Sequence, residues 1–134
     1  MTMREIIFRG KLPSGAWVYG DLRQYPSGAK AIKSTDFTSL MEVDPRTVGQ
    51  YTGLTDKNGT KIFEGDIIER NFTLTRGPIK ETREKQVGYV DYDCITGGYL
   101  IRGACNLRRQ WKGDTIEVIG NVYDNPELLE VRNG

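Results

Sequence analysis

Four oxygen-bearing side chains near the middle of the chain are the first candidates for metal chemistry. They are Asp56, Asn58, Glu64 and Asp66, and the spacing of the first two resembles the start of a calcium-binding loop. That loop ends on a glutamate at its twelfth position, which here is Ile67. The sequence therefore favours a structural interpretation. Asp56 to Gly59 would form a hairpin turn, while Glu64 and Asp66 would accept hydrogen bonds from nearby backbone amides.

Two further carboxylates, Asp91 and Asp93, alternate along one expected strand and so share a face of it. Together with Glu64 or Asp66 they would offer a carboxylate pair for general acid–base catalysis. A solvated strand face is the simpler interpretation, because nothing in the sequence brings these groups together. The chain has no histidine, which removes the usual general base near neutral pH and the usual zinc ligand. We therefore expect no enzymatic activity, no catalytic residue, no cofactor and no metal.

A basic and aromatic group in the C-terminal half is the best binding signal. Its cations could neutralise phosphates and its indole could stack on a base. The candidate contact residues for a protein partner or a nucleic acid are Arg102, Arg108, Arg109, Trp111 and Lys112.

The charge distribution leaves three interpretations of this group open. The segment from Arg70 to Lys85 adds further positive charge, whereas the residues from Asp114 to Glu130 are mainly acidic. The formal net charge is only +1, which gives no global attraction to nucleic acid or membrane. The first interpretation is that these charges belong to solvated loops. The second is that they mediate self-association or binding of another protein, and the third is that they bind nucleic acid.

Short strands separated by glycine and proline turns are expected to position these groups. Asp44-Pro45 predicts a capped single helical turn, and Asn125-Pro126 predicts a helix of one or two turns. Asn58-Gly59 predicts a type I′ turn, and Gly53 and Gly59 are expected to have positive φ. Strands are expected at residues 4–9, 16–22, 29–33, 38–43, 67–70, 86–93, 99–102 and 115–123, and a long mobile hairpin tip or loop at 71–85.

The fold class that follows is mainly β, with short antiparallel strands and one or two short helices in a single domain of 134 residues. Residues 60–134 are expected to form a small SH3-like barrel, and residues 1–55 to add N-terminal strands. No apolar run reaches the ~18 residues of a membrane span, and Met1 is not followed by an apolar leader segment. Cys94 and Cys105 are then expected to be reduced thiols of a cytoplasmic protein with no membrane partner.

Three sequence blocks resemble the YopX family of small phage and prophage proteins. They are residues 4–10, residues 48–68 with the sequence GQYTGL…DKNG…IFEGD, and residues 117–129 with the sequence EVIGNVYDNPELL. The residues that carry the middle and last blocks, which we interpret as structural, are Gly49, Gln50, Tyr51, Thr52, Gly53, Asn58, Gly59, Glu64, Gly65, Asp66, Gly120, Asn121 and Pro126. The resemblance implies a mainly β, phage-encoded protein and supplies no activity. Our functional hypothesis is a protein-interaction module that forms homo-oligomers and binds a host or phage protein. The alternative is a nucleic-acid-binding accessory protein.

Overall fold

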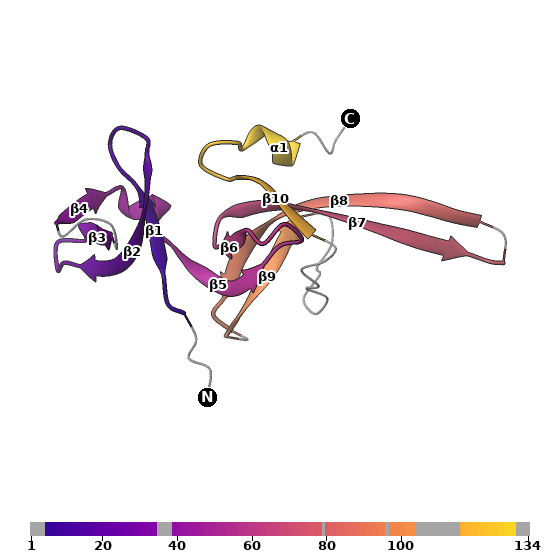
Figure 1. Ribbon diagram of the computed structural model, residues 1–134, viewed down its shortest axis with the longest axis horizontal. Coiled ribbons are helices and arrows are strands. Elements are labelled where there is room, and N and C mark those ends of the chain that lie inside the picture. Colours follow the sequence, from indigo (N-terminus) through magenta and orange to yellow (C-terminus); the bar gives the residue numbers. More distant parts are fainter. Residues whose placement is uncertain (1–4, 35–38, 79, 96, 104–115, 131–134) are drawn as a thin grey trace. The chain divides into compact units, whose positions relative to one another are not determined.

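The computed structural model describes residues 5–34, 39–78, 80–95, 97–103 and 116–130, and for 72–76, 80–84, 103 and 130 it describes the backbone alone. The protein is mainly β, as expected from the sequence. It divides into two compact units, Met1–Gly53 and Leu54–Gly134, which are treated separately below (Figure 1). Within the described residues, no helix has the length and apolarity needed to cross a membrane.

The first unit is an antiparallel sheet of short strands. Its strands are β1 (Phe8–Lys11), β2 (Trp17–Gln24), β3 (Lys30–Ser34), β4 (Leu40–Val43) and β5 (Gly49–Thr55). They follow one another in the order β4-β3-β2-β1-β5, and β6 (Lys61–Phe63) continues the order beyond β5. The strands expected at residues 4–9 and 16–22 correspond to β1 and β2, which pair antiparallel with Arg9 opposite Tyr19.

The helical turn expected after Asp44 is confirmed as the 3₁₀ helix η1 (Pro45–Thr47). The Asp44 carboxylate accepts a hydrogen bond from the Arg46 amide at 3.1 Å. The Thr47 hydroxyl donates to the Asp44 carbonyl at 2.7 Å and accepts from the Lys11 amide at 2.9 Å. Because Thr47 is buried, these bonds fix the turn against β1 inside the first unit.

The turn between β5 and β6 differs in type from the one expected. Gly53 and Gly59 have the positive φ predicted for them, 90° and 83°. However, a type I′ turn needs positive φ at both central residues, and no described residue other than glycine has it. The Gly59 amide donates to the Asp56 carbonyl, and the Asp56 amide to the Thr60 carbonyl. The Asn58-Gly59 prediction was therefore wrong in detail, because glycine takes the left-handed position at the end of the turn rather than sharing it with Asn58.

The second unit is built on a four-stranded antiparallel sheet in the order β10-β7-β8-β9. Its strands are β7 (Asp66–Arg76), β8 (Lys80–Asp93), β9 (Gly98–Gly103) and β10 (Ile116–Asn121), followed by the one-turn helix α1 (Glu127–Glu130). A buried cluster fills one face of this sheet and consists of Ile62, Ile68, Val90, Ile101 and Ile116. The described strands leave β9 and β10 at opposite edges, so the expected SH3-like barrel is not closed by them.

Residues 71–85, expected as a mobile tip or loop, form the ends of β7 and β8. The two strands are paired from Asn71 opposite Lys85 to Arg76 opposite Lys80, and Gly77 turns the chain with a φ of 70°. Of the two alternatives, the hairpin tip is confirmed and the loop is wrong. The loop alternative gave weight to the charges and to Gly77-Pro78. It overlooked the alternation of Thr with Phe and Leu in residues 72–75, a pattern typical of a strand.

Candidate functional site

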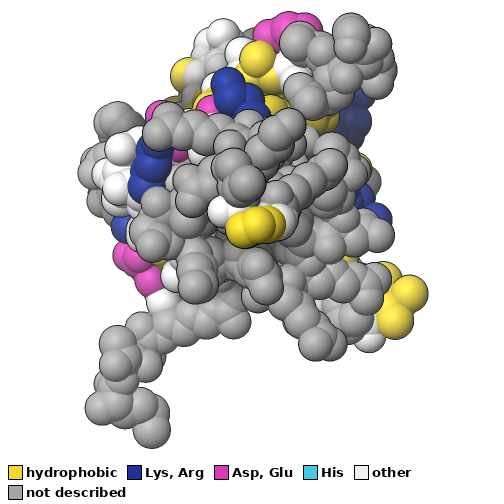
Figure 2. All heavy atoms as spheres, turned by 90° about the vertical axis from the view of Figure 1, so that its right-hand side faces the viewer, with side chains coloured by type: hydrophobic (Ala, Val, Ile, Leu, Met, Phe, Trp, Pro, Cys, Tyr) yellow, Lys and Arg dark blue, Asp and Glu magenta, His cyan; other side chains and the backbone are white. Residues whose placement is uncertain are grey.

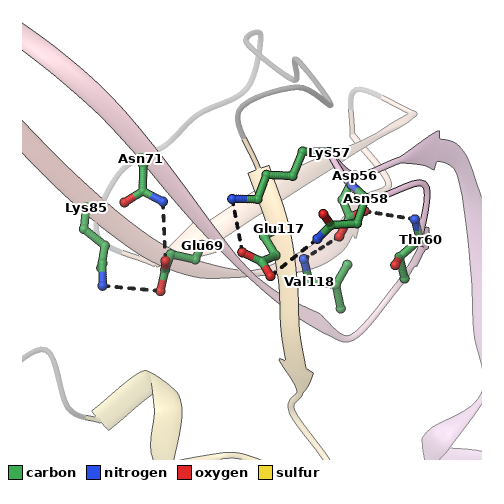
Figure 3. Close-up of polar contacts among 9 residues, drawn as sticks. All are labelled: Asp56, Lys57, Asn58, Thr60, Glu69, Asn71, Lys85, Glu117 and Val118. Atoms are coloured by element: carbon green, nitrogen blue, oxygen red, sulfur yellow. Dashed lines mark hydrogen bonds and ion pairs between the residues drawn. The ribbon is translucent and has the colours of Figure 1, made fainter.

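Asp56 ties the β5–β6 turn to β10 (Figure 3). One carboxylate oxygen, Oδ1, accepts from the amides of Asn58 at 2.8 Å and Thr60 at 2.9 Å. The other oxygen, Oδ2, accepts from the Val118 amide at 2.9 Å. Asp56 is 6% exposed, and its burial raises the pKa. The hydrogen bonds from Val118, Thr60 and Asn58 outweigh burial and hold the pKa below its ordinary value. The side chain is thus an ionised acceptor for three backbone amides, which leaves little of it for binding a cation.

A row of paired charges runs across β10, β7 and β8 beside this turn (Figure 3). Glu117 on β10 lies directly opposite Glu69 on β7. Lys57 Nζ lies 3.3 Å from Glu117 Oε1, and Lys85 Nζ lies 3.7 Å from Glu69 Oε2. Each carboxylate therefore has its own lysine, and both lysines are solvent-exposed. Pairs of this kind contribute little to stability, so the row is a charged, neutralised sheet surface.

The acidic turn between β6 and β7 is held by its own backbone and by two neighbouring segments. Asp66 is 2% exposed, and its carboxylate accepts from the Phe63 amide at 2.7 Å. Gly65, with a φ of 89°, donates its amide to the Val90 carbonyl and accepts from the Val122 amide. The Glu64-Gly65-Asp66 segment therefore joins β8 to the segment after β10.

The segment after β10 is a compact network around Asn121. The Asn121 side-chain oxygen accepts from the amides of Tyr123 at 3.0 Å and Asp124 at 2.9 Å. The Asn121 amide donates to Asn125 Oδ1 at 3.3 Å. A Cβ added at Gly120 would lie 2.6 Å from that same oxygen. Asn125 thus directs its side-chain oxygen back to Asn121, and Pro126 follows before α1.

The remaining residues of the middle block belong to β5. Gly49 and Gln50 lie opposite Arg9 and Phe8 of β1. Tyr51 and Thr52 are both buried. Strand pairing and burial therefore give these motif residues structural positions.

The carboxylates Asp91 and Asp93 have separate local partners. Asp91 Oδ2 accepts from the Arg102 guanidinium across the β8–β9 pair, and Asp93 Oδ1 accepts from the Ile95 amide at 3.1 Å in the β8–β9 turn. Within the described ranges, no three histidine, cysteine, aspartate or glutamate side chains gather as metal ligands would.

Of the five basic and aromatic candidates, only Arg102 lies within the described residues. Its hydrogen bond with Asp91 raises the pKa of the guanidinium and neutralises part of its charge. Arg108, Arg109, Trp111 and Lys112 lie outside the described residues. On the one face drawn in Figure 2, the visible lysine and arginine side chains lie in several separate places, and aspartate and glutamate side chains are visible on the same face.

Sequence reasoning missed a cation–aromatic group in the first unit. The Arg9 guanidinium lies 4.6 Å from the centre of the Trp17 ring, and Lys11 Nζ lies 5.8 Å from it. Lys11 is directly opposite Trp17 on the β1–β2 hairpin, so the hairpin register was the signal that could have found the group. Arg9 is only 5% exposed, and we interpret the group as a stabilising contact of the hairpin.

In the second unit, β7 and β8 extend beyond their neighbouring strands in the segment for which the sequence predicted a hairpin tip or loop. β10 accompanies β7 only as far as Arg70, and β9 accompanies β8 only from Gly88. Between these limits, the residues from Asn71 to Lys85 form a two-stranded ribbon, which we call the arm. Figure 1 shows β7 and β8 continuing together beyond the ends of β10 and β9.

The fold and the structural motifs define a mainly β protein with antiparallel sheets. The family model described as YopX protein matches residues 8–130. The chain therefore belongs to the YopX family. A search of curated proteins found no match. Among solved structures, the crystal structure of protein EF1440 from Enterococcus faecalis is similar, with a TM-score of 0.56 and 20% sequence identity. The likeness covers 95% of this chain and 99% of that chain, and at this identity it shows a shared fold.

Proposed function

We propose that this chain is a non-enzymatic interaction module that binds copies of itself, encoded by a phage or prophage and acting in the cytoplasm. The observation that carries the proposal is the arm. Its two strands remain paired where neither β10 nor β9 accompanies them. The resemblance of the sequence to phage and prophage proteins supports the genomic origin.

The physical chemistry of an isolated ribbon supports a binding role for the arm. A two-stranded hairpin alone is at best marginally stable in water, because it has no sheet neighbour on either edge and no second layer. Its edges offer rows of backbone donors and acceptors, and these are a template for an added strand. Strand addition is a recurring way in which one protein recognises another. Among the described residues no third strand pairs with the arm, and a second copy of the chain is the partner that we propose for its edges.

The described carboxylates support a non-enzymatic role. Asp56 and Asp66 are buried and accept hydrogen bonds from backbone amides. Asp91 and Arg102 form an ion pair on the exposed sheet surface. These groups are therefore engaged in holding turns and strands. The nucleic-acid alternative has less support, because the charges of the described surface are mixed and the one described candidate, Arg102, is paired.

The test is to shorten the arm and measure the mass of the chain in solution. Asn71 and Lys85 lie directly opposite each other, so residues 72–84 can be replaced by Asn-Gly, a two-residue hairpin loop. Light scattering after size exclusion, at two salt concentrations, should show the unaltered chain as an oligomer and the shortened chain as a monomer. Pro78→Ala, which keeps the length of the arm, is the matched control and should remain oligomeric.

Two results would count against the proposal. One is a chain that stays monomeric at the highest concentration measured, since there would be no self-association to explain. The other is a shortened chain with the mass of the unaltered oligomer, since the arm would then not carry the association. A cooperative thermal transition in the shortened chain establishes that the loss of mass does not come from unfolding.

A further inference from the structure

The outer edge of β8 in the arm carries an unusual order of charges. From Lys80 to Val87 this edge is not accompanied by β9, which pairs only from Gly88 onward. The sequence over Lys80–Glu84 is Lys-Glu-Thr-Arg-Glu. Its charges alternate about a central uncharged residue, Thr82, as plus, minus, zero, plus, minus.

This order is complementary to itself when two copies run antiparallel. With Thr82 opposite Thr82 of the second copy, Glu81 is opposite Arg83 and Lys80 is opposite Glu84. The twofold relation repeats both pairs on the other side of Thr82. Every charged position from Lys80 to Glu84 then has an opposite charge across the strands, an arrangement that stabilises a cross-strand pair.

Neighbouring registers lose this complementarity. A slip of one residue in one direction places Lys80 opposite Lys85 and Glu81 opposite Glu84. A slip in the other direction places Lys80 opposite Arg83. Like charges directly opposite each other destabilise a strand pair, so the sequence selects the register centred on Thr82.

From this edge, its sequence and its twofold register, we propose that two copies of the chain join by antiparallel pairing of their β8 strands, centred on Thr82. The two arms thereby form one continuous four-stranded ribbon. The contact is isologous, with the same surface used by both copies. This inference rests on the proposed self-association and adds the surface, the register and the symmetry that produce it.

The pairing within the chain makes Glu81 and Arg83 suitable for testing. Across the arm, Glu81 lies opposite Thr75 and Arg83 lies opposite Thr73. Reversing either charge therefore places no like charge opposite it inside the chain. A change in association can then be assigned to the contact between copies.

The experiment measures dissociation by sedimentation equilibrium for Glu81→Arg, Arg83→Glu, the double variant, and an equimolar mixture of the two single variants. Each single variant turns two attractive pairs into two repulsive ones and should raise the dissociation constant about tenfold or more. The double variant restores opposite charges, as does the mixture, where one chain carries two arginines and the other two glutamates. Both should associate as the unaltered chain does. Glu42→Arg and Arg23→Glu, at exposed positions of the first unit, are matched controls and should have no effect.

A cysteine placed at the twofold centre gives an independent measurement. With Cys94→Ser and Cys105→Ser as background, Thr82→Cys should form a disulfide between copies under mild oxidation, because directly opposite residues are about 5 Å apart. Thr75→Cys, on the other strand of the arm, should not.

The outcomes separate the two proposals. Single variants that associate normally, a mixture that does not recover, or Thr75→Cys crosslinking in place of Thr82→Cys would overturn the β8 pairing while leaving self-association intact. An unaltered chain that is monomeric throughout would overturn the proposed function itself.

Discussion

At the scale of single residues, Asp56 has a carboxylate that could bind a cation, but it accepts hydrogen bonds from backbone amides instead. It is surrounded by three amides from a turn and from a strand distant in sequence. Those bonds are charge-assisted, and charged acceptors form stronger hydrogen bonds than neutral ones. The residue therefore joins the β5–β6 turn to β10 within the second unit.

We predict that Asp56→Asn lowers the free energy of unfolding by about 1–3 kcal/mol at neutral pH, since the amide has one acceptor oxygen and its nitrogen would meet a backbone donor. Because the pKa of Asp56 is depressed in the folded protein, its contribution is present above the unfolded pKa of about 3.9 and is lost as pH falls through the folded pKa. Urea unfolding at about pH 6 and about pH 3 measures both effects. The variant should lose less stability on acidification.

The matched control is Asp21→Asn, an exposed position on β2, which should change stability little at either pH. Equal loss of stability on acidification in the unaltered chain and Asp56→Asn would show that other carboxylates dominate the acid response.

At the scale of elements, the connection from β10 to α1 depends on close packing at Gly120. Asn125 returns its side chain to the Asn121 amide and so occupies the space beside the Gly120 Cα. The motif Gly-Asn-Val-Tyr-Asp-Asn-Pro is thereby explained as one structural unit, in which the glycine makes room for the second asparagine.

We expect Gly120→Ala to destabilise the protein by about 1–3 kcal/mol, the usual cost of adding a methyl group to a filled site. The added Cβ would lie 2.6 Å from Asn125 Oδ1 and 2.9 Å from its Cγ. Gly98→Ala on β9 is the control, because a Cβ there has nothing within 4 Å. Chemical denaturation measures the free energy of unfolding of both variants. Equal stability of Gly120→Ala and Gly98→Ala would contradict this account of the motif.

The arm is the element for which local sequence and pairing disagree most. Its charged residues and Gly77-Pro78 are typical of a loop, yet its register with no shift from Ile67 to Arg76 makes it a continuation of the sheet. Strand pairing is a long-range property, and the well-packed base of β7 and β8 sets the register that the arm continues. The alternation in residues 72–75 therefore indicates a strand, whereas its register follows from the base of β7 and β8.

At the scale of the whole molecule, the buried core of the second unit joins most of its strands. The second unit has a contiguous cluster of buried isoleucine and valine side chains between β6, β7, β8, β9 and β10. Ile68 is 1% exposed and belongs to β7, which pairs with both β8 and β10.

Accordingly, Ile68→Ala should lower the free energy of unfolding by about 2–5 kcal/mol, through lost burial and the cavity that remains. Ile68→Val, which removes a single methylene, should cost about 0.5–1.5 kcal/mol. Urea unfolding, monitored by far-UV circular dichroism, measures the free energy of unfolding of both variants. Nearly equal values for the two variants would mean that the site collapses on truncation.

The sequence by itself determined the mainly β class, the family, the capped turn at Asp44 and most strand positions. These depend on alternation, turn chemistry and motif residues that act over a few positions. Only the tertiary structure showed that the Asp56 carboxylate accepts a hydrogen bond from the Val118 amide and that Gly120 leaves space for the Asn125 side chain. It likewise showed that Arg102 pairs with Asp91 and that residues 71–85 are paired strands. Asp56 and Val118 are 62 residues apart. The other contacts join residues closer along the chain, but they depend on the strand register and packing of the folded unit, which the local sequence pattern does not specify.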